Sequence, residues 1–245
     1  MQFDNYESFY NTAVEKYSNN NIRKKKYFHS KGQLFVKLVQ TLNNKKLLKQ
    51  YDAKQYEKLN KNFQTALRNF DHVKELTQLF YKLLKESKRK DKSTLLIKDD
   101  TVGEINITAQ QIVTQVGWTY CTLCEILRQY LISIIDFKKI TKQNPTGIGA
   151  AIKTLEDNGF PVDFFEDVDS KVRNSFFHFD FEFKEDKIFC DNYPSKYKDN
   201  KWRTEKDNSQ KEYILLADLM VLVSHVDESM LPPMTFFVWH NQQKA

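Results

Sequence analysis

The sequence predicts an all-α protein. Only 6 of its 245 residues are glycine and 5 are proline, so few positions favour a turn. Apolar residues recur at helical spacing over long stretches, and aromatic residues make up 14% of the chain, which is enough to build a substantial core. One short stretch alternates apolar and polar residues instead, and there we expect a small β-hairpin inserted into a helical bundle.

The first hundred residues are expected to form an extra N-terminal helical region. Helical periodicity covers residues 3–17, 34–48 and 51–87. The pattern fails over residues 88–103, where a charged run is followed by turn-like residues. We therefore predict two domains, one over residues 1–100 and one over residues 101–245.

The second domain is predicted to continue as helices. Thr108 is suited to cap the first of them, because its hydroxyl can accept the free N–H groups of the opening turn. Asn158 and Gly159 favour a left-handed end to another helix. The prolines within residues 230–233 are expected to end the last one. The shorter helices are expected over residues 148–158, 163–177 and 210–227.

The alternating stretch begins at Phe179. Phe179, Phe181 and Phe183 are separated by polar residues, residues 188–190 return as a second strand, and residues 201–204 are a candidate third strand. We expect the phenylalanine row to be the buried face of a small sheet. A platform on which nucleobases stack is the alternative.

The most informative motif combines Arg173, Asn174 and His178. Residues five apart diverge by about 140° on a continuing helix, but the helix is expected to end near His178 because strand alternation follows, so the two side chains can converge. A guanidinium binds phosphate bidentately, and an imidazole exchanges protons near neutral pH. RNA carries its own nucleophile, the 2′-OH. We therefore expect RNA cleavage that needs no metal and no cofactor.

This motif resembles the R-x4–6-H signature of the HEPN superfamily, in which Asn, Asp or His directly follows the arginine. The resemblance spans roughly residues 108–230 and implies a helical bundle that acts as a metal-independent endoribonuclease of a microbial defence or toxin system. It also implies a homodimer with a composite active site, and an antitoxin or activator protein as partner. His178 would transfer the proton, Arg173 would clamp the phosphate and Asn174 would position them.

Some features leave alternatives open. Glu125 is a candidate supporting residue, because some family members carry an acidic residue on the preceding helix, and Asp169 lies four residues before Arg173, where it can form an ion pair with it. Arg173 as a surface ion-pair partner and His178 as a core-edge residue is one alternative. A catalytically inactive HEPN module that binds RNA or a protein is the other. Asp180 stands where one toxin subgroup has a tyrosine that receives AMP, so that form of control is in doubt.

Other patterns are given weaker interpretations. Residues 68–72 have the form R-N-x-x-H inside a continuing helix, and we expect a solvated face. Cys121 and Cys124 are expected to be core residues, since Cys190 is the only other cysteine and a zinc site needs four ligands. The basic runs at residues 23–26 and 88–90 are expected to be solvated, with RNA contact as the alternative.

The bulk composition limits the remaining classes. The formal net charge is +6, which permits an RNA partner without requiring one. No apolar run is long enough to cross a bilayer, and the sequence does not open with a signal-peptide pattern. Three cysteines fit a reducing, cytoplasmic setting. The sequence has no glycine-rich phosphate loop and no G-x-S-x-G, so nucleotide hydrolases and serine hydrolases have no support.

Overall fold

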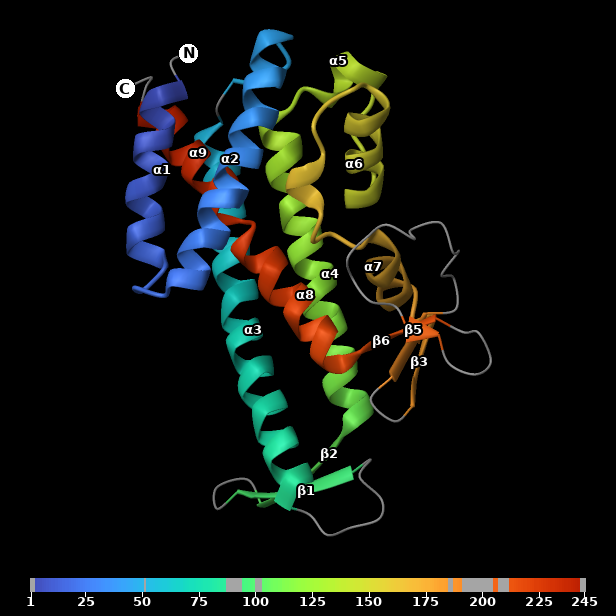
Figure 1. The fold of residues 1–245 in the computed structure, drawn as a ribbon. Helices are drawn as coiled ribbons and strands as arrows, with labels where there is room; N and C mark the ends of the chain where they lie inside the picture. Colours follow the sequence, from blue (N-terminus) through green and yellow to red (C-terminus); the bar gives the residue numbers. More distant parts are fainter. Residues whose placement is uncertain are drawn as a thin grey trace. The chain divides into compact units, whose positions relative to one another are not determined.

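The computed structural model describes residues 3–50, 52–86, 94–99, 103–184, 187–190, 205–206 and 212–242 (Figure 1). Most of them are helical, as the sequence predicts. The chain divides into two compact units, each built from segments on both sides of residue 100, and the predicted boundary there stays a prediction. None of the described helices combines the length and apolar character that crossing a membrane requires. The first unit is Met1–Gln64, Leu123–Ser170 and Ser224–Ala245, and the second is Thr65–Thr122 and Lys171–Val223.

The first unit is helical. Within it, α1, α2 and α9 pack against one another. Tyr6 is fully buried there, and its hydroxyl donates a 2.7 Å hydrogen bond to the carbonyl of Pro232. Phe35 packs between the rings of Phe164 and Phe236. The elements are α1 (Phe3–Tyr17), α2 (Ile22–Asn44), the start of α3 (Ala53–Glu86), the end of α4 (Ala109–Ile134), α5 (Phe137–Thr141), α6 (Ile148–Asp157), the 3-10 turn η1 (Asp163–Phe165), the end of α8 (Leu216–Glu228) and α9 (Leu231–Gln242).

Two helix starts in this unit differ from the prediction. Helix α2 begins at Ile22 rather than at residue 34, because the Asn21 side chain accepts a hydrogen bond from the backbone N–H of Lys24 and caps the first turn. The basic run at residues 23–26 is therefore helical. Helix α8 ends at Glu228, just before Pro232 and Pro233, as predicted. The two prolines then lie in the first turn of α9, a helix that was not predicted, since a missing N–H costs nothing at that position.

The predicted helix over residues 163–177 is wrong in its first half. The chain forms η1 and then, after a break, the eight-residue helix α7 (Ser170–Phe177). Phe164 and Phe165 are both buried in η1. Asp167 is also buried and turns its carboxylate to Lys31, so the backbone leaves the helical path at that point.

The second unit carries the strands. Strand β6 lies between β4 and β5, so the antiparallel order is β3-β4-β6-β5, and β1 and β2 form a separate hairpin. Helix α4 opens directly after Thr108, in agreement with the predicted cap position. The elements are the rest of α3, β1 (Thr94–Asp99), β2 (Gly103–Thr108), the start of α4, α7, β3 (Phe181–Lys184), β4 (Lys187–Cys190), β5 (Glu205–Lys206), β6 (Glu212–Leu215) and the start of α8.

The predicted hairpin after the motif is confirmed as β3 and β4, but the sheet is larger than expected. Residues 212–215 form β6 rather than the start of a helix, because Tyr213 and Ile214 suit a strand and pair with Phe189 and Ile188 of β4. The hairpin of β1 and β2 falls where the sequence predicted only a boundary. The candidate strand at residues 201–204 lies outside the described residues.

Candidate functional site

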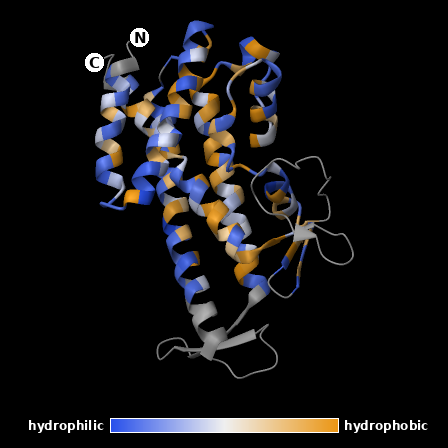
Figure 2. Cartoon of the chain, in the orientation of Figure 1, coloured by the Kyte–Doolittle hydropathy of each residue, from blue (hydrophilic) through white to orange (hydrophobic). Residues whose placement is uncertain are grey.

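The motif helix α7 is held in the second unit by its buried face. Val172 and Phe176 are fully buried, and Phe176 packs against Phe181 of β3 with ring centroids 4.4 Å apart. The ring of Phe176 also lies over Gly117 of α4, so closely that a Cβ at this glycine would meet it at 1.9 Å. Hydrophobic residues follow most of α4 in Figure 2. Glycine thus lets α7 approach α4 more closely than any other residue would.

The end of α7 confirms the predicted helix end. The N–H of Asp180 donates to the carbonyl of Ser175 at 2.8 Å, and that of Phe179 donates to Phe176 at 3.3 Å. These two bonds form a Schellman cap, in which Phe179 takes the left-handed position with φ of 56°. His178 therefore occupies the C-cap, the last position before the chain turns away to β3.

Arg173 lies along one side of this end. Its guanidinium carbon is 4.3 Å from the ring centroid of Phe177, and Nη1 donates a 3.0 Å hydrogen bond to Oδ1 of Asn174. Its Nε is buried and has no hydrogen-bond partner within the described part of the chain. Its backbone carbonyl accepts a bond from the thiol of Cys121 at 3.2 Å. The guanidinium therefore has one fixed partner and retains donors that an anion could occupy.

His178 contacts the same phenylalanine. Its ring meets Phe177 edge-on, with centroids 5.3 Å apart, and the side chain is exposed. The predicted trio of Arg173, Asn174 and His178 thus gathers at one helix end, and Phe177 touches two of the three.

The two supporting residues belong to the first unit. The Glu125 carboxylate accepts hydrogen bonds from Arg128 and, at 2.8 Å, from the Gln129 amide, both on its own helix. Asp169 directly precedes α7. Their supporting roles stay predictions.

The cysteines have the core character that the sequence predicts. Cys121, Cys124 and Cys190 are buried and form no disulfide bond. Burial raises the pKa of the Cys121 thiol to about 11, although the nearby charge of Arg173 acts in the opposite direction. This thiol is therefore protonated near neutral pH and is a poor nucleophile. Among the described residues, no three His, Cys, Asp or Glu side chains are grouped as a metal site would require.

The sequence missed a group of exposed rings beside the motif. Trp118, Phe177 and Phe179 are 39%, 46% and 64% exposed, and we call them the aromatic shelf. The Trp118 ring contacts Phe179 edge-on at 5.5 Å and Phe177 at 6.5 Å. Phe179 was expected in a buried row, but the Schellman cap turns it out of the strand. The exposure of Phe179 depends on its own backbone angle φ. The alternation of apolar and polar residues therefore could not predict it.

A cavity of about 380 Å³ adjoins the shelf within the second unit. Trp118 lines it together with Asn69 and His72 of α3 and Gln115 of α4. The R-N-x-x-H pattern of residues 68–72 thus lies on an exposed face of α3, as predicted, and its histidine borders this cavity.

The first unit contains a buried charged cluster that we did not predict from the sequence. Lys31 is 1% exposed and forms an ion pair with Asp167, and it donates a 3.1 Å bond to the carbonyl of Phe164. Tyr27 donates to Asp167 at 2.6 Å, and Nδ1 of His225 lies 3.3 Å from the other carboxylate oxygen. The signal was present, since Lys31 occupies a core position of the helical pattern between Phe28 and Phe35.

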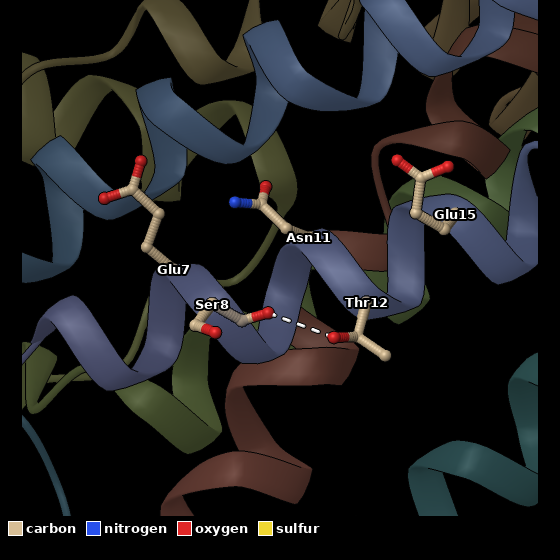
Figure 3. A pocket seen from close by; sticks show the side chains of 5 residues that line it. All are labelled: Glu7, Ser8, Asn11, Thr12 and Glu15. Carbon is tan, nitrogen blue, oxygen red and sulfur yellow. Dashed lines mark hydrogen bonds between the residues drawn. The ribbon is translucent and has the colours of Figure 1, made fainter.

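A second depression lies over the outer face of α1 in the same unit. Figure 3 shows that one helix supplies all its walls, and the side-chain hydroxyl of Thr12 donates to the carbonyl of Ser8 at 3.2 Å. Glu15 also forms an ion pair with Lys25. An open face with two carboxylates and no buried wall has little to bind a ligand. It is lined by Glu7, Ser8, Asn11, Thr12 and Glu15.

Comparison with known proteins finds no relative of this chain. No family model, no curated protein and no solved structure matches the chain.

Proposed function

We propose that this chain is a metal-independent endoribonuclease that cleaves RNA by attack of the 2′-OH on the neighbouring phosphate. One observation carries the proposal. Arg173 and His178 lie at one helix end and contact the same ring of Phe177. A cation for the phosphate and a group that exchanges protons near neutral pH are the minimum set for this reaction.

The roles follow from the contacts. Asn174 accepts a hydrogen bond from one guanidinium nitrogen of Arg173 and so fixes its plane, while the remaining N–H groups stay available for phosphate oxygens. The buried Nε of Arg173 has no partner in the described residues, which is costly unless a ligand completes it. His178 takes the proton-transfer role because its exposed ring can approach the 2′-OH or the leaving oxygen.

The proposed cleavage is a transesterification that consumes neither water nor a cofactor. The 2′-oxygen forms a bond to phosphorus while the bond from phosphorus to the 5′-oxygen breaks. The proton of the 2′-OH passes to an imidazole, and the departing 5′-oxygen receives a proton. The products are one strand with a 2′,3′-cyclic phosphate and one with a 5′-OH. A homodimer would bring two imidazoles to one cleft, so that one accepts and the other donates.

The resemblance to HEPN proteins supports a place in a microbial defence or toxin system, in the cytoplasm, under the control of an antitoxin or activator. A second candidate function is an inactive module of the same type that binds RNA. The stacking of Arg173 on Phe177 and its bond to Asn174 favour it, because these contacts already engage part of the guanidinium.

The test is RNA cleavage in excess EDTA by the purified chain and four variants. We expect Arg173→Ala and His178→Ala to lose about 10²–10⁴-fold in rate and to remain folded. Arg173→Lys keeps the charge but not the planar fork, so its rate should fall between those of the wild type and Arg173→Ala. Arg68→Ala, on the similar pattern of α3, is the matched control and should cleave like the wild type.

Two results would contradict the nuclease. One is cleavage that stops in EDTA and returns with Mg²⁺, and the other is cleavage that survives both alanine substitutions. RNA binding without cleavage by any of the proteins would favour the inactive module.

A further inference from the structure

The aromatic shelf presents an unusual amount of ring surface to solvent. In the described residues, six large hydrophobic side chains are exposed, and three of them, Trp118, Phe177 and Phe179, lie together here. All three belong to the second unit, on α4 and around the end of α7. Isolated exposed apolar residues are common, but a group in mutual contact points to a binding surface.

The backbone holds Phe179 in this position at a cost. A left-handed φ of 56° is normally filled by glycine, because a Cβ is crowded against the backbone there. Phe179 gains little burial in return, since it is 64% exposed. Strain of this kind is typical of functional positions, where a ligand contact outweighs it.

The cavity beside the shelf has groups that suit a flat polar ligand. The indole of Trp118 forms one wall, and the side chains of Asn69, His72 and Gln115 bring amide and imidazole groups that both donate and accept hydrogen bonds. The hydroxyls of Thr119 and Thr122 donate to carbonyls of their own helix. None of the described residues that line this cavity is a carboxylate, so an RNA chain meets no local repulsion there.

A nucleobase fits these features better than a second copy of the chain. Three aromatic side chains at these exposures offer roughly 300 Å² of surface, whereas a stable dimer buries about 800 Å² per partner. A base has an apolar face that stacks on rings and a polar edge that amides can read. Arg173 lies 4.3 Å from the Phe177 centroid, so a phosphate held by its guanidinium would place the adjoining base near the shelf.

We infer that the aromatic shelf and its cavity bind unstacked bases of single-stranded RNA next to the phosphate held by Arg173. This inference rests on the proposed function for the class of ligand and for the place of the phosphate. It assigns Trp118, Phe177 and Phe179 to stacking, and Asn69 and Gln115 to contacts with a base edge.

The test measures binding in a His178→Ala background, where the proposed cleavage is blocked. Two fluorescent oligomers of equal length are titrated by anisotropy: a mixed-sequence single-stranded RNA, and the same sugar–phosphate chain without bases. We expect the RNA to bind at least tenfold more tightly than the abasic chain. Phe179→Ala combined with Trp118→Leu should remove most of that preference and leave abasic binding unchanged.

Control variants distinguish a loss of base binding from misfolding or a change in self-association. Tyr17→Ala removes a ring from α1 whose exposure (51%) lies within the range of the shelf rings, and it should change neither affinity. Circular dichroism and sedimentation of each variant report folding and self-association. Should folded shelf variants retain the full preference for bases, the inference is wrong. It is also wrong if they only change the oligomeric state, because the shelf is then a contact between copies.

Cleavage assays of the same shelf substitutions in the chain that retains His178 separate this inference from the proposed nuclease. Base-dependent binding that needs the shelf, in a wild type that does not cleave RNA, supports the shelf and overturns the nuclease. Cleavage that depends on His178, with KM and RNA affinity unchanged in the shelf variants, supports the nuclease and overturns the shelf.

Discussion

Lys31 and Asp167 show what individual residues contribute to the first unit. Both are almost fully buried, and each satisfies the charge of the other among the side chains of Tyr27 and His225. A buried pair of this kind adds little net stability, but removal of one partner leaves an uncompensated charge in a low-dielectric interior. Substitution of one partner alone is therefore expected to lower the free energy of unfolding strongly.

Lys31→Met should lower the free energy of unfolding by about 3–5 kcal/mol, because Asp167 is left buried without its main counter-ion. The matched control is Lys25→Met, which breaks the exposed ion pair with Glu15 on the surface of the same unit. It should cost at most about 1 kcal/mol. Urea unfolding followed by circular dichroism measures both, and equal effects of the two substitutions would contradict this account of the cluster.

Asp167 should also give the stability a defined pH dependence. Burial raises the pKa of this carboxyl, but hydrogen bonds from His225, Lys31 and Tyr27 and the charge of Lys31 outweigh it and lower the pKa from 3.8 to about 2. A lowered pKa in the folded state stabilises the protein above pH 4, and that contribution is lost as the pH falls from about 4 to 2.

The expected loss from Asp167 is about 2 kcal/mol over this window. Urea unfolding at intervals from pH 5 to pH 2 should show a steeper fall for the wild type than for Asp167→Asn. Parallel curves for the two proteins would mean that the carboxyl titrates equally in the folded and unfolded chains.

At the scale of elements, the contact of α7 with α4 decides where the motif lies. A Cβ on Gly117 would meet the fully buried Phe176 ring at 1.9 Å, so the ring or the helices would have to shift. Gly117→Ala should therefore cost about 1–3 kcal/mol, although alanine is otherwise the better helix former. Adding Phe176→Leu should recover part of the loss. A Gly117→Ala protein as stable as the wild type would show that the helices are not in contact there.

The helix cap at Phe179 permits a second measurement at this scale. Phe179→Ala and Phe179→Gly both remove the ring, but only glycine relieves the left-handed backbone. The glycine variant should be more stable than the alanine variant by about 1 kcal/mol. Equal thermal and urea midpoints for the two would indicate that residue 179 is not left-handed in solution.

Elements with a clear period were predicted from the sequence, and those set by tertiary contacts were not. The helix over residues 3–17 has its predicted bounds, and the hairpin after the motif pairs as expected. The break between η1 and α7 depends on Asp167 turning toward Lys31, a partner far away in the sequence. Likewise, Tyr213 and Ile214 form a strand because β4 is there to pair with them.

At the scale of the whole molecule, the sequence located the motif but not its surroundings. Arg173, Asn174 and His178 are close in sequence, and one helix end gathers them. The cavity combines Asn69 of α3 with Gln115 of α4, which only the packing of the second unit brings together. The exposure of Phe179 follows from the left-handed cap, a position where the sequence has no glycine. Local patterns therefore predicted where the motif lies, and packing decided which rings and polar groups surround it.

In the proposed reaction, RNA supplies its own nucleophile and the chain needs no metal to cleave it. The most direct measurement is end-group analysis after incubation in EDTA of an RNA and of the same sequence with 2′-O-methyl groups throughout. The account predicts 2′,3′-cyclic phosphate and 5′-OH ends from the RNA alone, and none from either substrate with His178→Ala. Cleavage of the methylated strand, or products with 5′-phosphate ends, would contradict it.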